Sequence, residues 1–271
     1  GAFTLLGYGS EQQKRKYLPD IARGKKLTAF ALTEETAGSD ASGIKTTAKR
    51  SDGGYILNGT KRFITNGGEA DLYTVIALTD KERGIRGASS ILVEKGTPGF
   101  SFGRKEKKMG IRTSATRELI FEDCFVPAEN LIGRQGAGFA QAMRLFEMSR
   151  PGIGAQALGL AQGALEAAVE HAKERIQFGH PIISFQAVQH MLANMATDIE
   201  AARALVYATA RTIDSGARNI NMESAMAKVF ASDVAMRVTT DAVQVFGGVG
   251  YMRDYPVEKM MRDAKITQIY A

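Results

Sequence analysis

The chain has 271 residues, of which 44% are hydrophobic and 24% charged, and its formal net charge is +6. This length allows one large domain or two smaller ones around a sizeable core, and no apolar run is long enough for a membrane span. A single cysteine, Cys124, excludes an internal disulfide framework and most cysteine-based metal sites. Because Lys and Arg are spread along the chain, the charge favours solvated faces or an anionic small ligand over nucleic acid.

The first residues have a helical pattern. Residues 10–13, SEQQ, form a predicted capping box at the start of a short helix that Pro19 and Gly24 close. Residues 1–26 therefore resemble the end of a helical region. No targeting segment is visible, because no basic stretch precedes the short apolar one.

A β domain is predicted over residues 27–130. Seven short segments rich in β-branched and aromatic residues are separated by Gly, Asn and Asp, which is typical of an antiparallel β domain. These segments are TAFALT, IKTTAKR, YILNGTKRFITN, LYTVIAL, SSILVEK, FSFGRKEKK and RELIFEDCFV. Asp52-Gly53-Gly54 predicts a hairpin, and Cys124 is expected to be a small core side chain of the last strand.

Residues 131–271 are predicted to form a helical bundle. Apolar residues alternate steps of four and three, as in a bundle seam: Val188, Leu192, Met195, Ile199, Ala202 and Val206. Gly216 is expected to end this helix and Asn221 to cap the next. Residues 152–168 are unusually small-sided, which allows close helix packing. A charged helix over 255–264 and an apolar turn over 266–270 complete an α+β protein with segregated layers.

Several segments together resemble the acyl-CoA dehydrogenase family, over nearly the whole chain and in the family's order. They are FALTEETAGSD (30–40), LNGTKRFITNGGEAD (57–71), EKKMGIR (106–112), LIFEDCFVPAENLIG (119–133), GFAQAMRLFEMSRPGIGAQALGLAQ (138–162), ERIQFGHPI (174–182), QVFGG (244–248) and YPVEKMMRDAKITQIY (255–270). The resemblance implies a helical N-terminal domain, a β middle domain and a C-terminal four-helix bundle, assembled as a homotetramer, a dimer of dimers. It also implies that most of the N-terminal domain and the last helices are missing here.

The resemblance implies FAD as the cofactor and no metal. The implied FAD contacts are Leu32, Thr33, Ser39, Phe63, Ile64, Thr65, Arg175, Gln177, Phe178, Gln186, Gln244, Gly247 and Gly248. Each motif also has a purely structural interpretation: residues 39–40 as a turn, residues 63–65 as a strand end, and Arg175 as a helix C-terminal charge. Glu35-Thr36 stands where the family usually has Pro-Gly, which weakens the assignment of Ser39.

The implied substrate is an acyl-CoA thioester. Its implied contacts are Ser39, Glu147, Ser149, Arg150 and Tyr270. Arg150 has the alternative of a surface charge before Pro151. Ala271 occupies the position of the family's catalytic Glu base, and Ser149 occupies the base position of other members, where a serine cannot serve. An engineered Glu-to-Ala change, a truncated chain end and a natural variant with its base elsewhere remain open explanations.

The resemblance thus implies an FAD-dependent enzyme that dehydrogenates a short-chain acyl-CoA to the 2-enoyl-CoA and passes electrons to an electron-transfer flavoprotein. With Ala271 the chain is expected to be inactive or impaired. Alternatives are an enoyl-CoA reductase, a glutaryl- or cyclic acyl-CoA dehydrogenase, and a catalytically silent FAD- or acyl-CoA-binding subunit. The expected location is the bacterial cytoplasm or the mitochondrial matrix.

Overall fold

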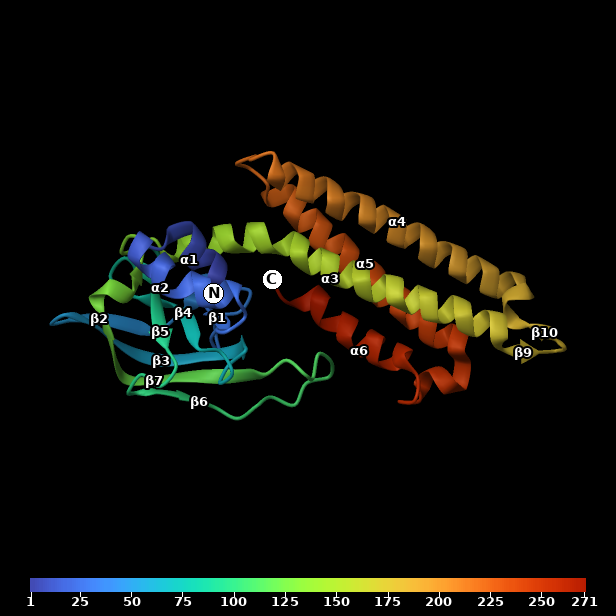
Figure 1. Cartoon of the computed structure of the whole chain (residues 1–271), viewed down its shortest axis with the longest axis horizontal. Coiled ribbons are helices and arrows are strands. Elements are labelled where there is room, and N and C mark those ends of the chain that lie inside the picture. The colour runs from blue at the N-terminus through green and yellow to red at the C-terminus, as the bar shows by residue number, and fades with distance from the viewer. The chain divides into compact units, whose positions relative to one another are not determined.

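The computed structural model describes residues 1–271, which form two compact units. The first unit comprises residues 1–107 and 112–145 and contains a β-sheet. The second unit comprises residues 108–111 and 146–271 and is built mainly of long helices. Figure 1 shows the strands in blue to green and the long helices in green-yellow to red.

The sheet of the first unit has eight strands in the order β6-β7-β3-β2-β4-β5-β8, with β1 paired to β4. The strands are β1 (Thr28–Ala31), β2 (Thr47–Ser51), β3 (Gly54–Thr65), β4 (Leu72–Leu78), β5 (Ala88–Glu94), β6 (Phe100–Phe102), β7 (Thr116–Pro127) and β8 (Leu131–Ile132). Each of the seven predicted segments contains a strand, and the predicted hairpin turn joins β2 to β3. Only the first three residues of FSFGRKEKK form a strand. The residues after them have no regular secondary structure, and Arg104, Lys105 and Lys107 are exposed.

The sheet is not wholly antiparallel. The pairs β3–β7 and β4–β5 are antiparallel as predicted, but β1 runs parallel to β4, with Thr28 opposite Leu72. Parallel neighbours need a crossover of a dozen or more residues. The hairpin of β2 and β3 lies between β1 and β4 in the chain and supplies this crossover, which a strand-by-strand pattern does not reveal.

An aromatic cluster fills the core on one face of the sheet. The rings of Phe100 and Phe121 stack with centroids 4.8 Å apart, and Tyr73 meets Phe100 edge-on at 4.9 Å. Cys124 is completely buried in the same cluster, and burial raises the pKa of its thiol to about 11. The prediction of a small core side chain at this position is therefore confirmed.

Two short helices, α1 (Ala2–Tyr8) and α2 (Glu11–Ala22), belong to the first unit. The predicted capping box is confirmed, since Gln13 N donates to Ser10 Oγ at 3.1 Å and Ser10 N donates to Gln13 Oε1 at 2.9 Å. The prediction that Pro19 closes this helix is wrong, because Pro19 lies inside α2. Tyr17 is buried together with sheet residues, and this packing carries the helix past the proline.

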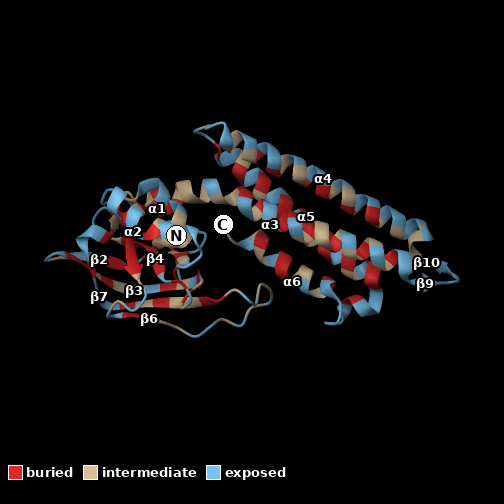
Figure 2. Cartoon of the chain, in the orientation of Figure 1, coloured by how far each residue is buried: buried red, intermediate tan, exposed pale blue.

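The second unit contains α3 (Gly138–Glu174, from residue 146 on), α4 (Gln186–Asp214), α5 (Asn221–Phe246) and α6 (Pro256–Ile269). A hairpin of β9 (Ile176–Gln177) and β10 (His180–Pro181) joins α3 to α4. Short 3-10 turns are η1 (Ala41–Gly43), η2 (Gly84–Gly87), η3 (Ala128–Asn130), η4 (Ile182–Ser184) and η5 (Gly247–Tyr251). Figure 2 shows buried residues recurring along the long helices, and the predicted α4 seam is buried from Leu192 onward.

Two local predictions in the bundle are wrong. Asn221 is not the cap of α5 but its first residue, and its side chain accepts a hydrogen bond from Arg150 instead. Residues 266–270 are not a turn, because α6 continues to Ile269. Val257, Ala264 and Thr267 are spaced by seven and three residues and all are buried, so Thr267 continues the buried face of α6, whereas Ile269 is exposed.

Ala164→Leu is expected to lower the stability of the helical unit by about 1–3 kcal/mol, the usual cost of overpacking a core. Ala164 is completely buried, and so are its helical neighbours Ala157, Ala161 and Ala168, which leaves no room for a larger side chain. Ala155→Leu is the matched control, because Ala155 is exposed on the same helix. Thermal unfolding followed by circular dichroism measures both variants, and equal melting temperatures would contradict the close packing.

Candidate functional site

Two of the predicted flavin-binding motifs lie side by side in the first unit. Residues 32–33 follow β1, and residues 63–65 end β3. Arg62 N donates to Thr33 O at 2.8 Å, and Lys61 Nζ donates to Leu32 O at 2.9 Å. Motifs about thirty residues apart in the sequence therefore meet inside the sheet, where residues 32–33 lie beside residues 61–62; we call this place the β1–β3 junction.

A β-bulge exposes Phe63 at the β1–β3 junction. The register of β3 and β7 shifts between Lys61 and Ile64, where two residues of β3 oppose only Glu118. Phe63 has a φ of 56°, rare for a residue with a side chain, and its side chain is 57% exposed. The guanidinium of Arg62 lies 5.2 Å from the ring centroid. Strained backbone and an exposed aromatic ring together mark a position available to a flat ligand.

The other predicted contacts at the β1–β3 junction differ in what they can offer a ligand. The side chains of Leu32 and Ile64 are buried in the core, so only their backbone atoms can meet a ligand. Thr33 is half-buried and Thr65 is exposed at the end of β3, opposite Thr116. The threonines can therefore present their hydroxyl groups, while the aliphatic residues hold the backbone in place.

Ser39 lies on an exposed loop of the same unit. Two backbone hydrogen bonds between Glu34 and Ala37 close a tight turn, with Glu35 and Thr36 exposed at its tip. Ser39 follows two residues later and is exposed. The turn thus accommodates Glu35-Thr36 where the family usually has Pro-Gly.

In the helical unit, the predicted pyrophosphate-binding residues lie on the β9–β10 hairpin. Phe178 and Gly179 have φ values of 55° and 82°, as a tight two-residue hairpin turn requires. The Phe178 side chain is 92% exposed at this tip. Arg175 and Gln177 before the tip and Gln186 at the start of α4 are also exposed. All these side chains face outward and can contact another molecule.

Gly247 and Gly248 form an open backbone segment at the end of α5. Gly247 has a φ of 64°, and no atom lies within 4 Å of where a Cβ would be on either glycine. A side chain at position 248 would therefore not clash with the rest of the chain. A ligand that approaches the backbone closely, however, would require a glycine at this position. Gln244, one turn earlier on α5, is exposed beside them. Phe246 anchors this segment by stacking on His171, with ring centroids 4.1 Å apart.

The stability of the helical unit is expected to fall as the pH falls from 7 to 5, and His171→Phe is expected to reduce that fall. Burial and the positive charge of Arg175 lower the pKa of His171 below its usual 6.5, although Glu174 raises it. The unfolded chain then binds the proton first, so protonation favours unfolding below about pH 6.5. The phenylalanine keeps the stack on Phe246 without titrating. Equal falls in melting temperature for both proteins would contradict this role of His171.

Residues of three helices of the second unit meet where α6 ends. The phenol of Tyr270 donates to Gln156 Oε1 on α3 at 2.7 Å, and burial raises the pKa of Tyr270, so the phenol stays protonated. Lys228 on α5 donates to Gln268 O at 3.2 Å, which fixes the last turn of α6. Ala271 follows Tyr270 and is exposed. We call this group the α6 corner.

Arg150 adds a second cation to the α6 corner. Its Nη1 donates to Asn221 Oδ1 at 3.1 Å. Burial is the largest cause that lowers the pKa of Lys228, and the positive charge of Arg150 is the second. Ser149 donates its hydroxyl to Phe146 O within α3, and Glu147 is half-buried two residues earlier. Two of the predicted substrate residues in this unit are therefore part of the α6 corner: Tyr270 through its hydrogen bond to Gln156, and Arg150 through its effect on Lys228.

Sequence reasoning missed Gln156, Asn221 and Lys228 as members of the α6 corner. A signal was present, because Gln156 lies seven residues after Ser149 and Lys228 seven after Asn221, which puts each pair on one helix face. Without the neighbouring helices, however, such a spacing does not distinguish a site from an ordinary polar face.

The segment EKKMGIR received no role from the sequence. In the structure its central residues pack on α6: Ile111 N donates to the buried Asp263 at 2.6 Å, and Arg262 donates to Met109 O at 2.8 Å. A Cβ on Gly110 would lie 2.3 Å from the Arg262 carbonyl oxygen, so only glycine fits there. The segment therefore holds the helix that leads to the α6 corner.

Comparison with known protein families agrees with this architecture. Residues 29–124 match the family model described as acyl-CoA dehydrogenase, middle domain, and residues 136–271 match the one described as acyl-CoA dehydrogenase, C-terminal domain. The fold is thus a β-sheet middle domain followed by a helical C-terminal domain of the acyl-CoA dehydrogenase type.

The chain belongs to the acyl-CoA dehydrogenase family. It is 55% identical to a short-chain specific acyl-CoA dehydrogenase of Megasphaera elsdenii, over 99% of this chain and 70% of that protein. It is 53% identical to an acryloyl-CoA reductase (NADH) of Anaerotignum propionicum, over 98% of this chain and 68% of that protein. A chain solved in work on the electron transferring flavoprotein of Acidaminococcus fermentans superposes with a TM-score of 0.97 at 58% identity, covering 99% of this chain and 70% of that one.

The family consists of flavoprotein oxidoreductases of fatty acid metabolism that depend on FAD and act on CH–CH groups. None of the helices is both long and apolar enough to cross a membrane.

Proposed function

We propose that this protein binds FAD and a short-chain acyl-CoA in a site of the kind that dehydrogenates the acyl-CoA to the 2-enoyl-CoA and passes electrons to an electron-transfer flavoprotein. The observation that carries the proposal is the 55% identity to a short-chain specific acyl-CoA dehydrogenase over 99% of the chain. The similarity to a chain solved in work on an electron transferring flavoprotein supports the choice of acceptor. The resemblance and the local geometry together support the role proposed for each residue.

Each unit by itself offers residues that suit a part of a flavin nucleotide. In the first unit, the exposed ring of Phe63 and the hydroxyls of Thr33 and Thr65 suit an aromatic heterocycle with polar edges. In the second unit, the exposed Arg175 suits a pyrophosphate, because its charge is permanent and its donors are paired. The open backbone at Gly248 allows a ligand to approach closely. FAD, when bound, supplies the acceptor for the β-hydrogen as hydride.

The α6 corner is proposed to bind the acyl-CoA next to position 271. The α-proton of a thioester is weakly acidic, so a hydrogen-bond donor must polarise the carbonyl. The backbone N–H of Ala271 is proposed as one such donor, and Arg150 as a contact for the CoA part. Ser39, in the first unit, is separately proposed to contact the CoA part. Ala271 offers no carboxylate, and a positioned general base contributes about 10²–10⁴-fold. We therefore propose that the chain with Ala271 dehydrogenates slowly or not at all.

Reduction of an enoyl-CoA is the second candidate. The observation that favours it is the 53% identity to an acryloyl-CoA reductase (NADH) over 98% of this chain. Dehydrogenation and reduction act on the same atoms of the substrate, so both reactions need the same contacts with FAD and the thioester. A homotetramer, a dimer of dimers, in the cytoplasm or the mitochondrial matrix completes the proposal.

The visible spectrum of the purified full-length protein tests the proposal. A yellow protein that butyryl-CoA bleaches, with recovery on adding an electron-transfer flavoprotein, supports the dehydrogenase. Oxidation of NADH that depends on acryloyl-CoA supports the reductase. A yellow protein that binds butyryl-CoA without bleaching supports the silent site with Ala271. A colourless protein that takes up no added FAD would overturn the proposal.

A further inference from the structure

The first unit contains a lysine that is completely buried. Lys61 lies in the middle of β3 with 0% of its side chain exposed, and its Nζ donates to Glu34 Oε1 at 2.7 Å. The Glu34 side chain is only 7% exposed and also accepts from Lys45 N at 2.6 Å and Thr46 N at 3.0 Å. Lysine is almost never fully buried unless it is paired, so this position calls for an explanation.

The stability of the fold is a weak explanation for this ion pair. Removing two charges from water costs several kcal/mol per ion, and a well-packed apolar pair is often as stable or more stable. Burial lowers the pKa of Lys61 to about 8, even though Glu34 raises it. Burial also raises the pKa of Glu34, but Lys61 and the backbone donors outweigh this and hold it below its usual range. Both groups are therefore charged at neutral pH.

The contacts of Lys61 tie the two predicted flavin motifs together. Its Nζ bonds the Leu32 carbonyl and the Glu34 carboxylate, and the next residue, Arg62, bonds the Thr33 carbonyl through its backbone N–H. Three consecutive residues after β1 are thus fixed to two consecutive residues of β3. The exposed, strained Phe63 comes directly after them.

We infer that the Lys61–Glu34 ion pair is a positioning device that fixes residues 32–33 against the Phe63 bulge at the geometry required to hold the flavin ring. Neither side chain is proposed to touch the flavin. A site held only by neighbouring loops is easily too loose, whereas buried hydrogen bonds behind the contact residues set their positions. This inference rests on the proposed function, because it assumes that FAD binds at the β1–β3 junction.

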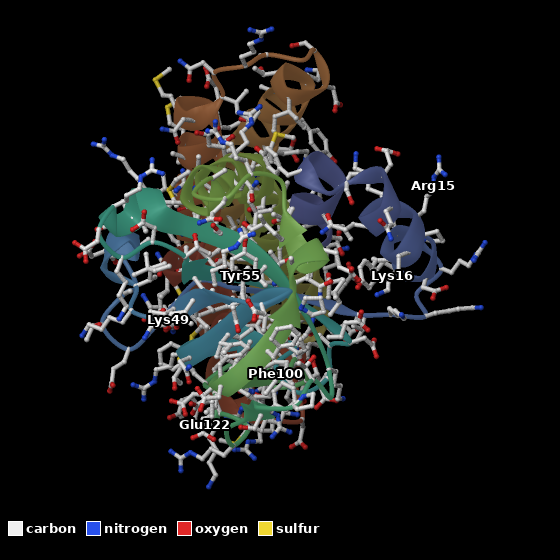
Figure 3. All side chains as sticks on the ribbon, turned by 90° about the vertical axis from the view of Figure 1, so that its left-hand side faces the viewer. Arg15, Lys16, Lys49, Tyr55, Phe100 and Glu122 are labelled. Atoms are coloured by element: carbon white, nitrogen blue, oxygen red, sulfur yellow. The ribbon has the colours of Figure 1, made fainter.

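The test compares FAD binding with thermal stability in four variants of the full-length protein. Lys61→Met leaves the Glu34 carboxylate buried without a cation, and Glu34→Gln leaves Lys61 without its partner. The double variant K61M/E34Q removes both charges and keeps one amide oxygen, which replaces one of the two carboxylate oxygens that accept from Lys45 N and Thr46 N. The control is Lys16→Met, which removes an exposed ion pair of the same unit, Lys16–Glu94 at 2.9 Å. The side chain of Lys16 on α2, labelled in Figure 3, is 55% exposed.

Each single variant is expected to lower the melting temperature, and the double variant to recover part of the loss, because no unpaired charge stays buried. The double variant is nevertheless expected to bind FAD about tenfold more weakly or worse, with a changed shape of the bound flavin's visible band. Lys16→Met should match the unsubstituted protein in both measurements. A double variant with unchanged FAD affinity and spectrum, or one that fails to fold, would overturn the inference, because the pair would then serve the fold alone. If the unsubstituted protein binds no FAD, the proposed function fails and this inference fails with it.

Discussion

Ala271→Glu in the full-length protein is expected to raise the rate at which butyryl-CoA bleaches the bound flavin by about 10²–10⁴-fold, the usual contribution of a positioned general base. The reason lies in how the chain before position 271 is held. Tyr270 is fixed by its hydrogen bond to Gln156, and Lys228 fixes the carbonyl of Gln268. A side chain at position 271 therefore starts from an anchored backbone.

The matched control for this prediction is Ala271→Gln, which has the size of Glu but cannot accept the α-proton. Position 271 is exposed, so both side chains can be accommodated there. Both variants are expected to bind FAD equally well, and only the glutamate is expected to bleach rapidly when followed by stopped-flow absorbance. Equal rates for the two variants would show that position 271 does not hold the base.

The local pattern of the sequence predicts most of the elements but not their partners. Alternating apolar residues and turn residues locate every long strand, and the α4 seam is correct because a helix buries one face wherever it packs. The parallel pairing of β1 with β4 depends instead on contacts between segments about forty residues apart. The end of α6 was missed because an apolar stretch such as 266–270 can be helix or turn until its buried face is known.

The candidate site was predicted as a set of motifs, and the structure adds the geometry that no motif contains. Residues 32–33 and 63–65 were each recognisable, but their contact depends on the bulge in β3. The positive φ of Phe63 could not be inferred, since it is rare for aromatic residues. Lys61 was not predicted to be buried or to hold the site together, because a lysine in a strand is normally exposed. Buried charges of this kind are visible only after the fold has enclosed them.

Phe178→Ala is expected to weaken FAD binding by about tenfold to a hundredfold, because burying a phenylalanine side chain contributes roughly 1.5–3 kcal/mol. Phe178 is 92% exposed within the chain, and its only ring neighbour is Phe185 at a centroid distance of 6.0 Å. An aromatic side chain this exposed stabilises the folded chain very little. Its apolar surface becomes useful only when another molecule covers it.

The same exposure makes the effect on FAD binding separable from folding. The melting temperature of the FAD-free protein should change little, because exposed substitutions usually alter stability by less than about 0.5 kcal/mol. Phenylalanine and alanine both carry a Cβ, so the substitution leaves the energetic cost of the positive φ at position 178 unchanged. Phe125→Ala is the control of the same residue type, because Phe125 on β7 is also exposed, at 44%. Titration of the FAD-free proteins followed by flavin fluorescence measures the affinities, and an equal effect of the two substitutions would exclude the β9–β10 tip as an FAD contact.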